Sequence, residues 1–391
     1  MRNHYDLVVI GSSSAGISAA EKARKSRPEA TIACFSEEPQ PPYYRPMLTE
    51  LMGNPAVLEK AAFTLRKPQW FSEQNIELFL STEVTGLDPA ARSLTTKEGQ
   101  SCTWGSCVLA TGSVPFVPLP EALALPNVFS CRSLLDAQKI LEASSTASRI
   151  IVIGGGLLGL EAAHYLNTGG KKITVVELMP RILPRQLDQT VSTWFAERIG
   201  SAGVDLRLGT QVKEIREQDG HLVVMTPAEE LEADLVLFSI GVRPRSELAR
   251  QAGLTVNRGI VVDPYMQTSD PHVFACGDCA EVAGQVLALW MPAMRMGHVA
   301  GHNAVSGPET AYVLTVPPAA LSAFSTRIFS VGQLEKGEVL EKKADEDNGL
   351  RLYFEEGVLT GVLLWGDTAR GMALSKALEA KADRATVEKL L

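Results

Sequence analysis

The chain has 391 residues, 45% of them hydrophobic and 21% charged, with a formal net charge of -8 at pH 7. This composition excludes a disordered chain and gives room for two or three domains of ~100–200 residues. The acidic balance argues against binding to nucleic acid or anionic membranes. No apolar run approaches the ~18 residues of a transmembrane helix, and the N-terminus lacks a signal-peptide layout, so a cytoplasmic protein with reduced cysteines is expected.

The chain opens with the segment "YDLVVIGSSSAGISAAEKAR", residues 5–24. Its apolar strand pattern is followed by a turn of small residues and an alanine-rich helix pattern, and the strand pattern "TIACF" comes next. Together these patterns predict a β-α-β unit. The turn keeps the first and last glycines of the dinucleotide-binding pattern G-x-G-x-x-G but has Ser13 at the middle position. The serine hydroxyl could hydrogen-bond a phosphate oxygen; a plain strand-helix turn without a ligand is the alternative.

A second unit of the same kind starts with "SRIIVIGGGLLGLEAAHYL", residues 148–166, and continues to the strand pattern "KITVVE". Here Gly154, Gly156 and Gly159 complete the glycine pattern, which allows a tight turn and close approach of a pyrophosphate. The helix N-terminus would face the phosphates with its partial positive charge. Glu177 ends the next strand, where its carboxylate would accept hydrogen bonds from the ribose hydroxyls and repel a 2′-phosphate. The sequence therefore predicts an NADH site that disfavours NADPH; an ordinary glycine turn is the alternative.

Beyond residue 310 the pattern changes. The strand-like runs "RIFSVGQLE", "LRLYFEE" and "LTGVLLWG" precede a helix pattern over "MALSKALEAKADRATVEKLL", residues 372–391. These runs predict a small C-terminal domain of α+β type that ends in one helix. No long linker or low-complexity segment interrupts the chain.

Five segments taken together resemble the FAD/NAD-dependent pyridine nucleotide reductases of the glutathione-reductase-type fold: "GSSSAG", "LATGS", "GGGLLGLE", "SIGVRP" and "FACGDCAE". The resemblance covers roughly residues 4–306 and, more loosely, the tail. The segments "PYYRPML", "RQLDQTV" and "FACGDCAE" are similar to those of NADH:rubredoxin oxidoreductases and of the flavoprotein part of NADH-dependent nitrite reductases. The implied fold class is α/β, with two dinucleotide-binding Rossmann-like domains and a small α+β C-terminal domain.

The resemblance also implies domain boundaries. An FAD-binding domain would consist of two parts, residues 1–115 and 246–310. An NAD-binding domain, residues 116–245, would be inserted between them, and a C-terminal interface domain would span residues 311–391.

FAD contacts are implied at positions that match the family's motifs. The pyrophosphate would lie along the first glycine turn, at Gly11, Ser12, Ser13, Ala15 and Gly16. One of two adjacent carboxylates would hold the adenosine ribose, Glu37 or Glu38. Other residues would approach the adenine, the ribityl chain or the flavin ring, namely Arg45, Val84, Ala110, Thr111, Gly112, Arg132, Asp278, Trp290 and Met291. Outside the resemblance, Arg45 is explained as a surface salt bridge and Trp290 as a core aromatic residue.

NAD contacts are implied around the second glycine turn, at Gly154, Gly156, Leu157, Leu158, Gly159, Glu177 and Gly241. Glu161 is the catalytic candidate, because relatives have a glutamate here near the flavin and nicotinamide, often paired with a lysine. That lysine would fall near position 50, where this chain has Glu50. Glu161 could therefore bond only to the nicotinamide amide, and a purely structural role at the helix start is the alternative.

Cysteines offer no clear redox or metal site. Related disulfide reductases place thiols in the stretch where "YYRPMLTE" has Arg45 and Pro46. Cys276 and Cys279 form a C-x-x-C, but their spacing is explained by the fingerprint around Asp278. Zinc would need four ligands at recognisable spacing, which neither this pair, the pair at 102 and 107, nor the six histidines provide. We predict no metal and no redox disulfide.

The resemblance implies an FAD-dependent oxidoreductase that passes electrons from NADH through the flavin to a small redox protein such as rubredoxin, another iron-sulfur protein being a further option. FAD is expected to bind without a covalent link. Three alternatives stay open: an NADH-oxidising flavoprotein subunit of a larger oxidoreductase complex, an NADH oxidase that uses O₂, and a slow NAD-responsive flavoprotein with a binding role. The acceptor is not identified, and both a monomer and a homodimer are compatible with the sequence.

Overall fold

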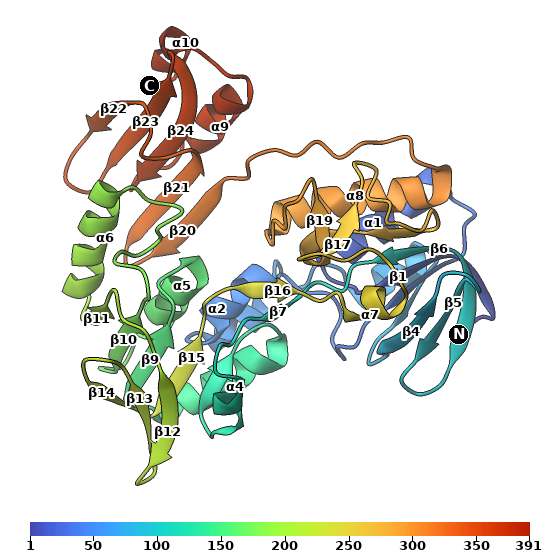
Figure 1. The fold of residues 1–391 in the computed structure, drawn as a ribbon, viewed down its shortest axis with the longest axis horizontal. Helices are drawn as coiled ribbons and strands as arrows, with labels where there is room; N and C mark the ends of the chain where they lie inside the picture. The colour runs from blue at the N-terminus through green and yellow to red at the C-terminus, as the bar shows by residue number, and fades with distance from the viewer. The chain divides into compact units, whose positions relative to one another are not determined.

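The computed structural model describes all 391 residues, which fall into two units that each combine distant segments of the chain (Figure 1). The first unit contains Met1–Pro46, Glu59–Val114 and Val242–Leu314. The second contains Met47–Leu58, Pro115–Gly241 and Thr315–Leu391. No helix of the chain combines the length and apolarity that a membrane span requires.

The first unit is built on a seven-stranded sheet. Its order is β3 (Ile76–Phe79), β2 (Ile32–Phe35), β1 (His4–Ile10), β6 (Ser101–Leu109), β5 (Ser93–Thr96) and β4 (Val84–Asp88), with β18 (Val273–Ala275) paired to β6. Strand β1 runs parallel to both of its neighbours, and Leu7, Val8 and Val9 are fully buried. Strands covered on both faces have continuous apolar sequences, which explains the opening pattern of the chain.

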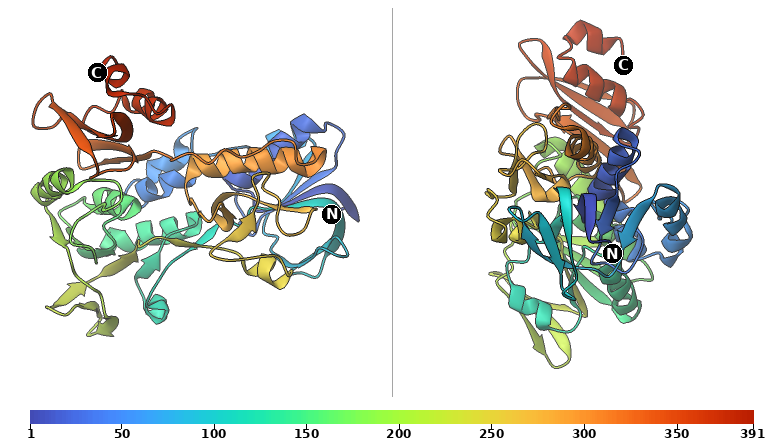
Figure 2. Two further views of the ribbon diagram at one scale, coloured as in Figure 1. Left: turned by 45° about the horizontal axis from the view of Figure 1, so that its top comes forward. Right: turned by 90° about the vertical axis from the view of Figure 1, so that its right-hand side faces the viewer.

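Helix α1 (Ser14–Ser26) packs along α8 (Trp290–Ser306) (Figures 1 and 2). This contact brings together the first and the last chain segment of the first unit. A Cβ atom at Gly301 of α8 would overlap the carbonyl oxygen of Ala19. A Cβ atom at Gly297, one turn earlier, would overlap that of Ala15. The close approach of the two helices therefore requires glycine at both positions.

The second unit contains a five-stranded parallel sheet in the order β11 (Val204–Arg207), β10 (Lys172–Val176), β9 (Arg149–Ile153), β15 (Leu235–Phe238) and β8 (Val128–Ser130). Its longer helices are α4 (Leu134–Thr146), α5 (Leu157–Leu166) and α6 (Gln189–Ser201). An antiparallel meander adds β12 (Glu214–Gln218), β13 (His221–Met225) and β14 (Glu230–Ala233). Both predicted β-α-β units are thus confirmed, each with its glycine turn between a strand and a helix.

Short elements complete the two units. The helical ones are η1 (Arg45–Met47), α2 (Leu48–Leu51), η2 (Pro55–Glu59), α3 (Pro68–Glu73), η3 (Pro120–Ala124), α7 (Glu247–Gln251) and η4 (Gly277–Cys279). The extended ones are β7 (Ser113–Pro115), β16 (Val242–Pro244), β17 (Ile260–Val262) and β19 (Ala280–Val282).

The C-terminal part of the second unit is an antiparallel sheet, in the order β20 (Ala319–Ala323), β21 (Thr326–Gly332), β24 (Val358–Trp365), β23 (Gly349–Glu355) and β22 (Glu338–Lys343). Helices α9 (Gly371–Glu379) and α10 (Arg384–Glu388) both contact β24 (Figures 1 and 2). The α/β class with an α+β C-terminal domain is therefore confirmed.

The single terminal helix predicted over residues 372–391 is wrong, because the chain breaks between α9 and α10. Lys381 adopts a left-handed conformation (φ 51°), and Ala382 N–H donates to Ala377 O. Asp383 then caps α10 by accepting a hydrogen bond of 2.8 Å from Thr386 N. An N-cap aspartate starts a new helix, so the alanine-rich pattern hides two short helices.

Candidate active site

The first glycine turn connects β1 to α1. Gly11 has φ 107° and donates to Phe35 O at 2.8 Å, and a Cβ atom at Gly16 would overlap the carbonyl oxygen of Gly11. Ala110 N–H donates to Ile10 O at 2.8 Å, so the segment that includes Ala110, Thr111 and Gly112 lies directly beside the turn. Glycine is therefore required by geometry at both retained positions.

Ser13, at the position of the middle glycine, is held by Arg45. Arg45 Nε donates to Ser13 Oγ at 3.1 Å. A hydroxyl that accepts one hydrogen bond still has its own O–H to donate, so Ser13 retains a donor at the N-terminus of α1. A 13-residue helix that starts at this turn adds its partial positive charge.

Arg45 belongs to a cluster with Glu38 and Tyr43. Its guanidinium pairs with Glu38, its Nη1 donates to the Tyr43 hydroxyl at 3.1 Å, and that hydroxyl donates to Glu38 Oε2 at 2.6 Å. The Arg45 and Glu38 side chains are each 19% exposed, so the pair is not an exposed surface salt bridge. Burial lowers the pKa of Arg45, but Tyr43, Glu38 and Asp278 raise it by more, and the cation is retained.

The two candidate ribose carboxylates have different partners. Glu38 uses both oxygens, one with Arg45 and the other with Tyr43, whereas Glu37 pairs through Oε1 with Arg245. Strand register adds a further difference between the two glycine turns. Gly154 N–H donates to Val176 O just before Glu177, but Gly11 N–H donates to Phe35 O, which is followed by Ser36. Glu177 directly follows the residue that accepts from its glycine turn, whereas Glu37 and Glu38 follow the corresponding residue, Phe35, by two and three positions.

Asp278 also lies near the first turn. Ser113 Oγ donates to Asp278 Oδ2 at 2.8 Å. The preceding Gly277 has φ 76°, and a Cβ atom there would lie 2.8 Å from Ala15 Cβ. The structure thus brings Asp278 and the α1 N-terminus together within the first unit.

The other FAD candidates are spread more widely. Trp290 is half-buried with its ring edge-on to Tyr44 at 4.9 Å, and Met291 is 56% exposed. Val84 starts β4 in the first unit. Arg132 lies in the second unit, where its N–H donates to Asp136 Oδ2 at 3.0 Å before α4. Trp290 is therefore not a fully buried core residue.

The second glycine turn connects β9 to α5. Gly154 has φ 120°, and a Cβ atom there would overlap the carbonyl oxygen of Ser239. A Cβ atom at Gly156, in contrast, would meet no protein atom within 4 Å. The middle glycine thus faces open space next to the α5 N-terminus, as a site that admits a pyrophosphate requires. Leu158 is 52% exposed in the first turn of α5, and Gly241 lies elsewhere in this unit with φ 104°.

Glu177 is anchored at the edge of this turn. Its Oε2 accepts from Gly155 N at 2.6 Å, and its Oε1 accepts from Met179 N at 2.7 Å. Backbone N–H groups hold the carboxylate in place while each oxygen keeps a lone pair for a further donor. This geometry suits recognition of two ribose hydroxyls.

Glu161 is mostly buried on α5. Thr49 Oγ1 donates to Glu161 Oε2 at 3.0 Å, and Thr49 is 7% exposed. Burial raises the pKa of Glu161 to about 7, although the Thr49 hydrogen bond lowers it in part. Glu50, next to Thr49 in the chain, accepts from Asn54 Nδ2 at 3.2 Å. Glu161 is therefore partly protonated near neutral pH.

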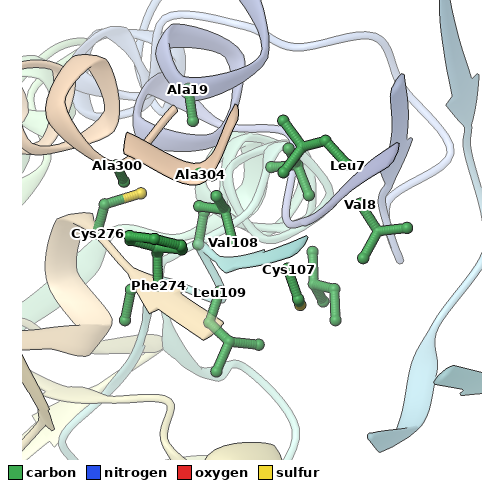
Figure 3. Close-up of a cluster of buried hydrophobic side chains, with 14 of the residues drawn as sticks. Leu7, Val8, Ala19, Cys107, Val108, Leu109, Phe274, Cys276, Ala300 and Ala304 are labelled. Carbon is green, nitrogen blue, oxygen red and sulfur yellow. The ribbon is translucent and has the colours of Figure 1, made fainter. Parts of the chain in front are cut away.

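All six cysteines are free thiols. Cys276 and Cys279 are fully buried, and burial raises the pKa of both thiols. Figure 3 shows the Cys276 side chain among apolar side chains such as Phe274 and Ala300. Cys279 Sγ donates to Leu109 O at 3.4 Å. Thiolate formation is disfavoured at both sites, and no group of three or more histidine, cysteine, aspartate or glutamate side chains could hold a metal.

Two residues near the site were not selected from the sequence. The side chain of Arg245 pairs with Glu37. Its backbone is hydrogen-bonded to the segment beside the first glycine turn, because Arg245 N–H donates to Gly112 O at 2.9 Å and Thr111 Oγ1 donates to Arg245 O at 2.6 Å. Thr49 is the other. Arg245 directly follows the quoted segment "SIGVRP", and Thr49 lies inside "PYYRPMLTE", so both stood beside recognised motifs.

Comparison with known proteins gives matches over nearly the whole chain. The family model described as "Pyridine nucleotide-disulphide oxidoreductase" matches residues 5–297, and "Rubredoxin NAD+ reductase C-terminal domain" matches residues 317–382. A nitrite reductase [NAD(P)H] of Bacillus subtilis (strain 168) is 32% identical over 98% of this chain, which spans only 48% of that relative. The chain thus has about half the length of this curated relative.

Other relatives match along their full length. A rubredoxin-NAD(+) reductase of Alcanivorax borkumensis is 30% identical over 96% of this chain and 99% of the relative. The crystal structure of the ferredoxin reductase for the CYP199A2 system from Rhodopseudomonas palustris is 27% identical, with a TM-score of 0.86 and coverage of 97% and 98% of the two chains. The chain belongs to the pyridine nucleotide-disulphide oxidoreductase family.

Proposed function

We propose that this protein is an NADH-dependent flavoprotein reductase that passes electrons through non-covalently bound FAD to a small redox protein such as rubredoxin. The observation that carries the proposal is the combination of two strand-glycine-helix turns with fully buried thiols at Cys276 and Cys279. Two such turns provide for two dinucleotides, and buried thiols are poor redox partners. The cytoplasm, which keeps thiols reduced, suits six free cysteines.

FAD would bind to the predicted FAD-binding ranges 1–115 and 246–310. The Ser13 hydroxyl and the α1 N-terminus would bond the pyrophosphate, and the Arg45 hydrogen bond would hold the Ser13 hydroxyl in place. Asp278 would bond the ribityl or pyrophosphate region. Glu37 is the better ribose candidate, because Glu38 already uses both oxygens within the Arg45 cluster. When bound, FAD would supply acceptance of a hydride from NADH and release of its electrons one at a time.

NADH would bind at the second glycine turn, in the predicted NAD-binding range 116–245. The open space at Gly156 and the α5 N-terminus would receive the pyrophosphate, and Glu177 would accept hydrogen bonds from the ribose hydroxyls. Glu161, held by Thr49, would bond the nicotinamide amide. A protonated carboxyl can donate as well as accept, which suits an amide that offers both a carbonyl and an N–H₂ group.

The acceptor is proposed from the relatives. The names of the full-length matches are a rubredoxin-NAD(+) reductase and a ferredoxin reductase, both of which indicate small redox proteins as acceptors. The C-terminal match, residues 317–382, also carries the rubredoxin reductase description. A second candidate is the NADH-oxidising part of a larger enzyme, which the nitrite reductase match favours. Co-purification of a further subunit would support that second candidate.

Anaerobic steady-state assays test this proposal. Purified holoenzyme with NADH should reduce rubredoxin or a small ferredoxin at least about tenfold faster than it reduces O₂ under air. The supernatant of acid-precipitated protein should contain the flavin. Equal or faster oxidation by O₂ would favour an NADH oxidase, and negligible turnover with every acceptor would favour a binding role.

A further inference from the structure

The loop that follows Glu177 is folded back onto the second glycine turn. Leu183 N–H donates to Gly155 O at 3.0 Å, and Gly209 N–H donates to Met179 O at 2.9 Å. Leu178 and Met179 are 64% and 46% exposed. The loop therefore borders the proposed ribose site, and Arg181 lies between its two tethered ends.

Arg181 is the residue of this loop whose positive charge is paired with a carboxylate. Its guanidinium forms a two-pronged ion pair with Glu335, in which Nη2 lies 3.0 Å from Glu335 Oε2. Arg181 Nη2 also donates to Pro184 O at 3.1 Å, and Gln189 N–H donates to Glu335 Oε1 at 2.8 Å. The side chains of Arg181 and Glu335 are 19% and 40% exposed.

Glu335 comes from the C-terminal sheet of the same unit, in the connection between β21 and β22. The Arg181 hydrogen bond keeps the pKa of Glu335 below its ordinary value, so the carboxylate stays ionised. Bidentate arginine-carboxylate pairs are among the stronger charge-assisted contacts, and their geometry fixes the direction of the guanidinium. Arg181 is thus both neutralised and oriented by Glu335.

Dinucleotide sites that accept NADPH commonly use an arginine near the ribose to bind the 2′-phosphate. This loop has such an arginine, four residues beyond Glu177, but its guanidinium is committed to another carboxylate. A 2′-phosphate would therefore meet the Glu177 carboxylate without a compensating cation from Arg181. Glu177 and Glu335, from different parts of the second unit, would therefore both disfavour binding of a 2′-phosphate.

We propose that Glu335 is a specificity-determining residue for the coenzyme, because it withholds the Arg181 guanidinium from the 2′-phosphate of NADPH. This inference rests on the proposed function of the second glycine turn as the NADH site. It assigns to the C-terminal domain a part in selecting the electron donor. Glu335 touches neither coenzyme itself and acts through Arg181.

The test measures binding to the holoenzyme and does not depend on an electron acceptor. Calorimetric titration with adenosine 2′,5′-diphosphate reports on the 2′-phosphate, and titration with adenosine 5′-diphosphate reports on the site without it. Glu335→Gln should bind the 2′,5′-diphosphate about three- to tenfold tighter than the parent, with 5′-diphosphate affinity unchanged within about twofold. The kcat/KM for NADPH should rise by a similar factor through KM.

Matched variants separate the proposal from a loss of structure. Glu338→Gln removes one carboxylate from an arginine pair in the same domain, that with Arg384, and should leave both affinities unchanged. Adding Arg181→Gln to Glu335→Gln should abolish the gain. Glu335→Ala, with a melting temperature near that of the parent, should also bind the 2′,5′-diphosphate tighter than the parent does.

Unchanged affinity of Glu335→Gln for the 2′,5′-diphosphate, with an unchanged melting temperature, would overturn the proposal. An equal gain in Glu338→Gln would also overturn it, because net charge would then be the cause. Failure of the parent to bind the 5′-diphosphate at all would instead contradict the proposed nucleotide site.

Discussion

Thr49 donates a hydrogen bond to Glu161, with 3.0 Å between Thr49 Oγ1 and Glu161 Oε2. A neutral hydroxyl thus contacts a carboxyl group whose pKa burial raises to about 7. His164 and Tyr165 follow on the same helix, and Thr49 lies on α2. A hydroxyl stabilises the ionised carboxylate much less than a cation does, so the proton is retained toward neutral pH.

Stability should therefore fall with pH in a way that depends on Glu161. The folded-state pKa lies above the unfolded value, so this contribution is fully present below about pH 4.5 and is lost as pH rises through about 7. Glu161→Gln cannot ionise. Its free energy of unfolding, relative to that of the parent, should therefore rise by on the order of 1–3 kcal/mol between about pH 5 and pH 8. Urea unfolding at both pH values measures this difference. The exposed Glu142→Gln variant is the control, and an equal pH dependence in parent and Glu161→Gln would refute the assignment.

The preference for NADH should depend on Glu177. A 2′-phosphate near the anchored carboxylate costs roughly 1 kcal/mol in bulk water and more in a partly buried site, so kcat/KM should favour NADH by about tenfold or more. Glu177→Gln keeps the shape of the side chain but loses its charge, and should reduce that ratio by at least about fivefold. Steady-state kinetics with both donors decide the matter. Equal efficiency of NADH and NADPH in the parent would place Glu177 away from the ribose.

FAD affinity should depend on Arg245. Its ion pair with Glu37 and the longer contact with Glu83, at 3.7 Å, connect two segments proposed to surround the adenosine end of FAD. Arg245→Ala removes these contacts of a partly exposed side chain, which is worth about 1 kcal/mol, and should weaken FAD binding about fivefold. Flavin fluorescence released on dilution of the holoenzyme measures the loss. Arg250→Ala, an exposed arginine on α7, should release no more flavin than the parent does.

The packing of α1 on α8 gives a prediction about stability. Gly301→Ala would force a methyl group into the carbonyl oxygen of Ala19 and should destabilise the first unit by about 1–3 kcal/mol. Gly200→Ala in α6 is the matched control, because a Cβ atom there meets no atom within 4 Å. That variant should be neutral or stabilised by about 0.5–1 kcal/mol. Similar melting temperatures for the two variants would show that α1 and α8 can separate freely.

The parts of the fold that follow local rules could be predicted from the sequence. The strand-turn-helix pattern predicts the positions of Gly11, Gly154 and Glu177, because each forms a hydrogen bond between the glycine turn and the next strand of its unit or the residue after it. Strand β22 was missed because its sequence "EVLEKK" is mostly charged, as suits the edge of a sheet. Strands β23, which pairs with β22, and β24 were predicted because most of their residues are apolar and buried.

Contacts between distant segments could not be predicted. Arg245 meets Glu37 across more than two hundred positions, and Glu335 meets Arg181 across more than one hundred and fifty. No local spacing encodes such pairs, because the whole chain must fold before the partners meet. The sequence could not decide between Glu37 and Glu38 for the same reason in part: Glu37 pairs with Arg245 from a distant segment, whereas Glu38 pairs with the nearby Arg45.

The buried thiols should be dispensable. Cys279→Ser can keep the hydrogen bond to Leu109 O, whereas Cys276 lies in apolar surroundings where alanine avoids burying an unpaired hydroxyl. The double variant Cys276→Ala/Cys279→Ser should bind FAD and reduce ferricyanide with NADH within about tenfold of the parent rate, a barrier change near 1.4 kcal/mol. A thousandfold loss of rate with FAD still bound would mean that a thiol takes part in turnover.

The most direct test counts electrons. An anaerobic reductive titration of the parent holoenzyme with dithionite, followed by flavin absorbance, reports every group that accepts electrons in the protein. We predict complete reduction after about two electrons per FAD, with no long-wavelength band from a thiolate beside the flavin. A requirement for about four electrons per FAD would reveal a redox-active disulfide and would contradict direct transfer from flavin to the acceptor.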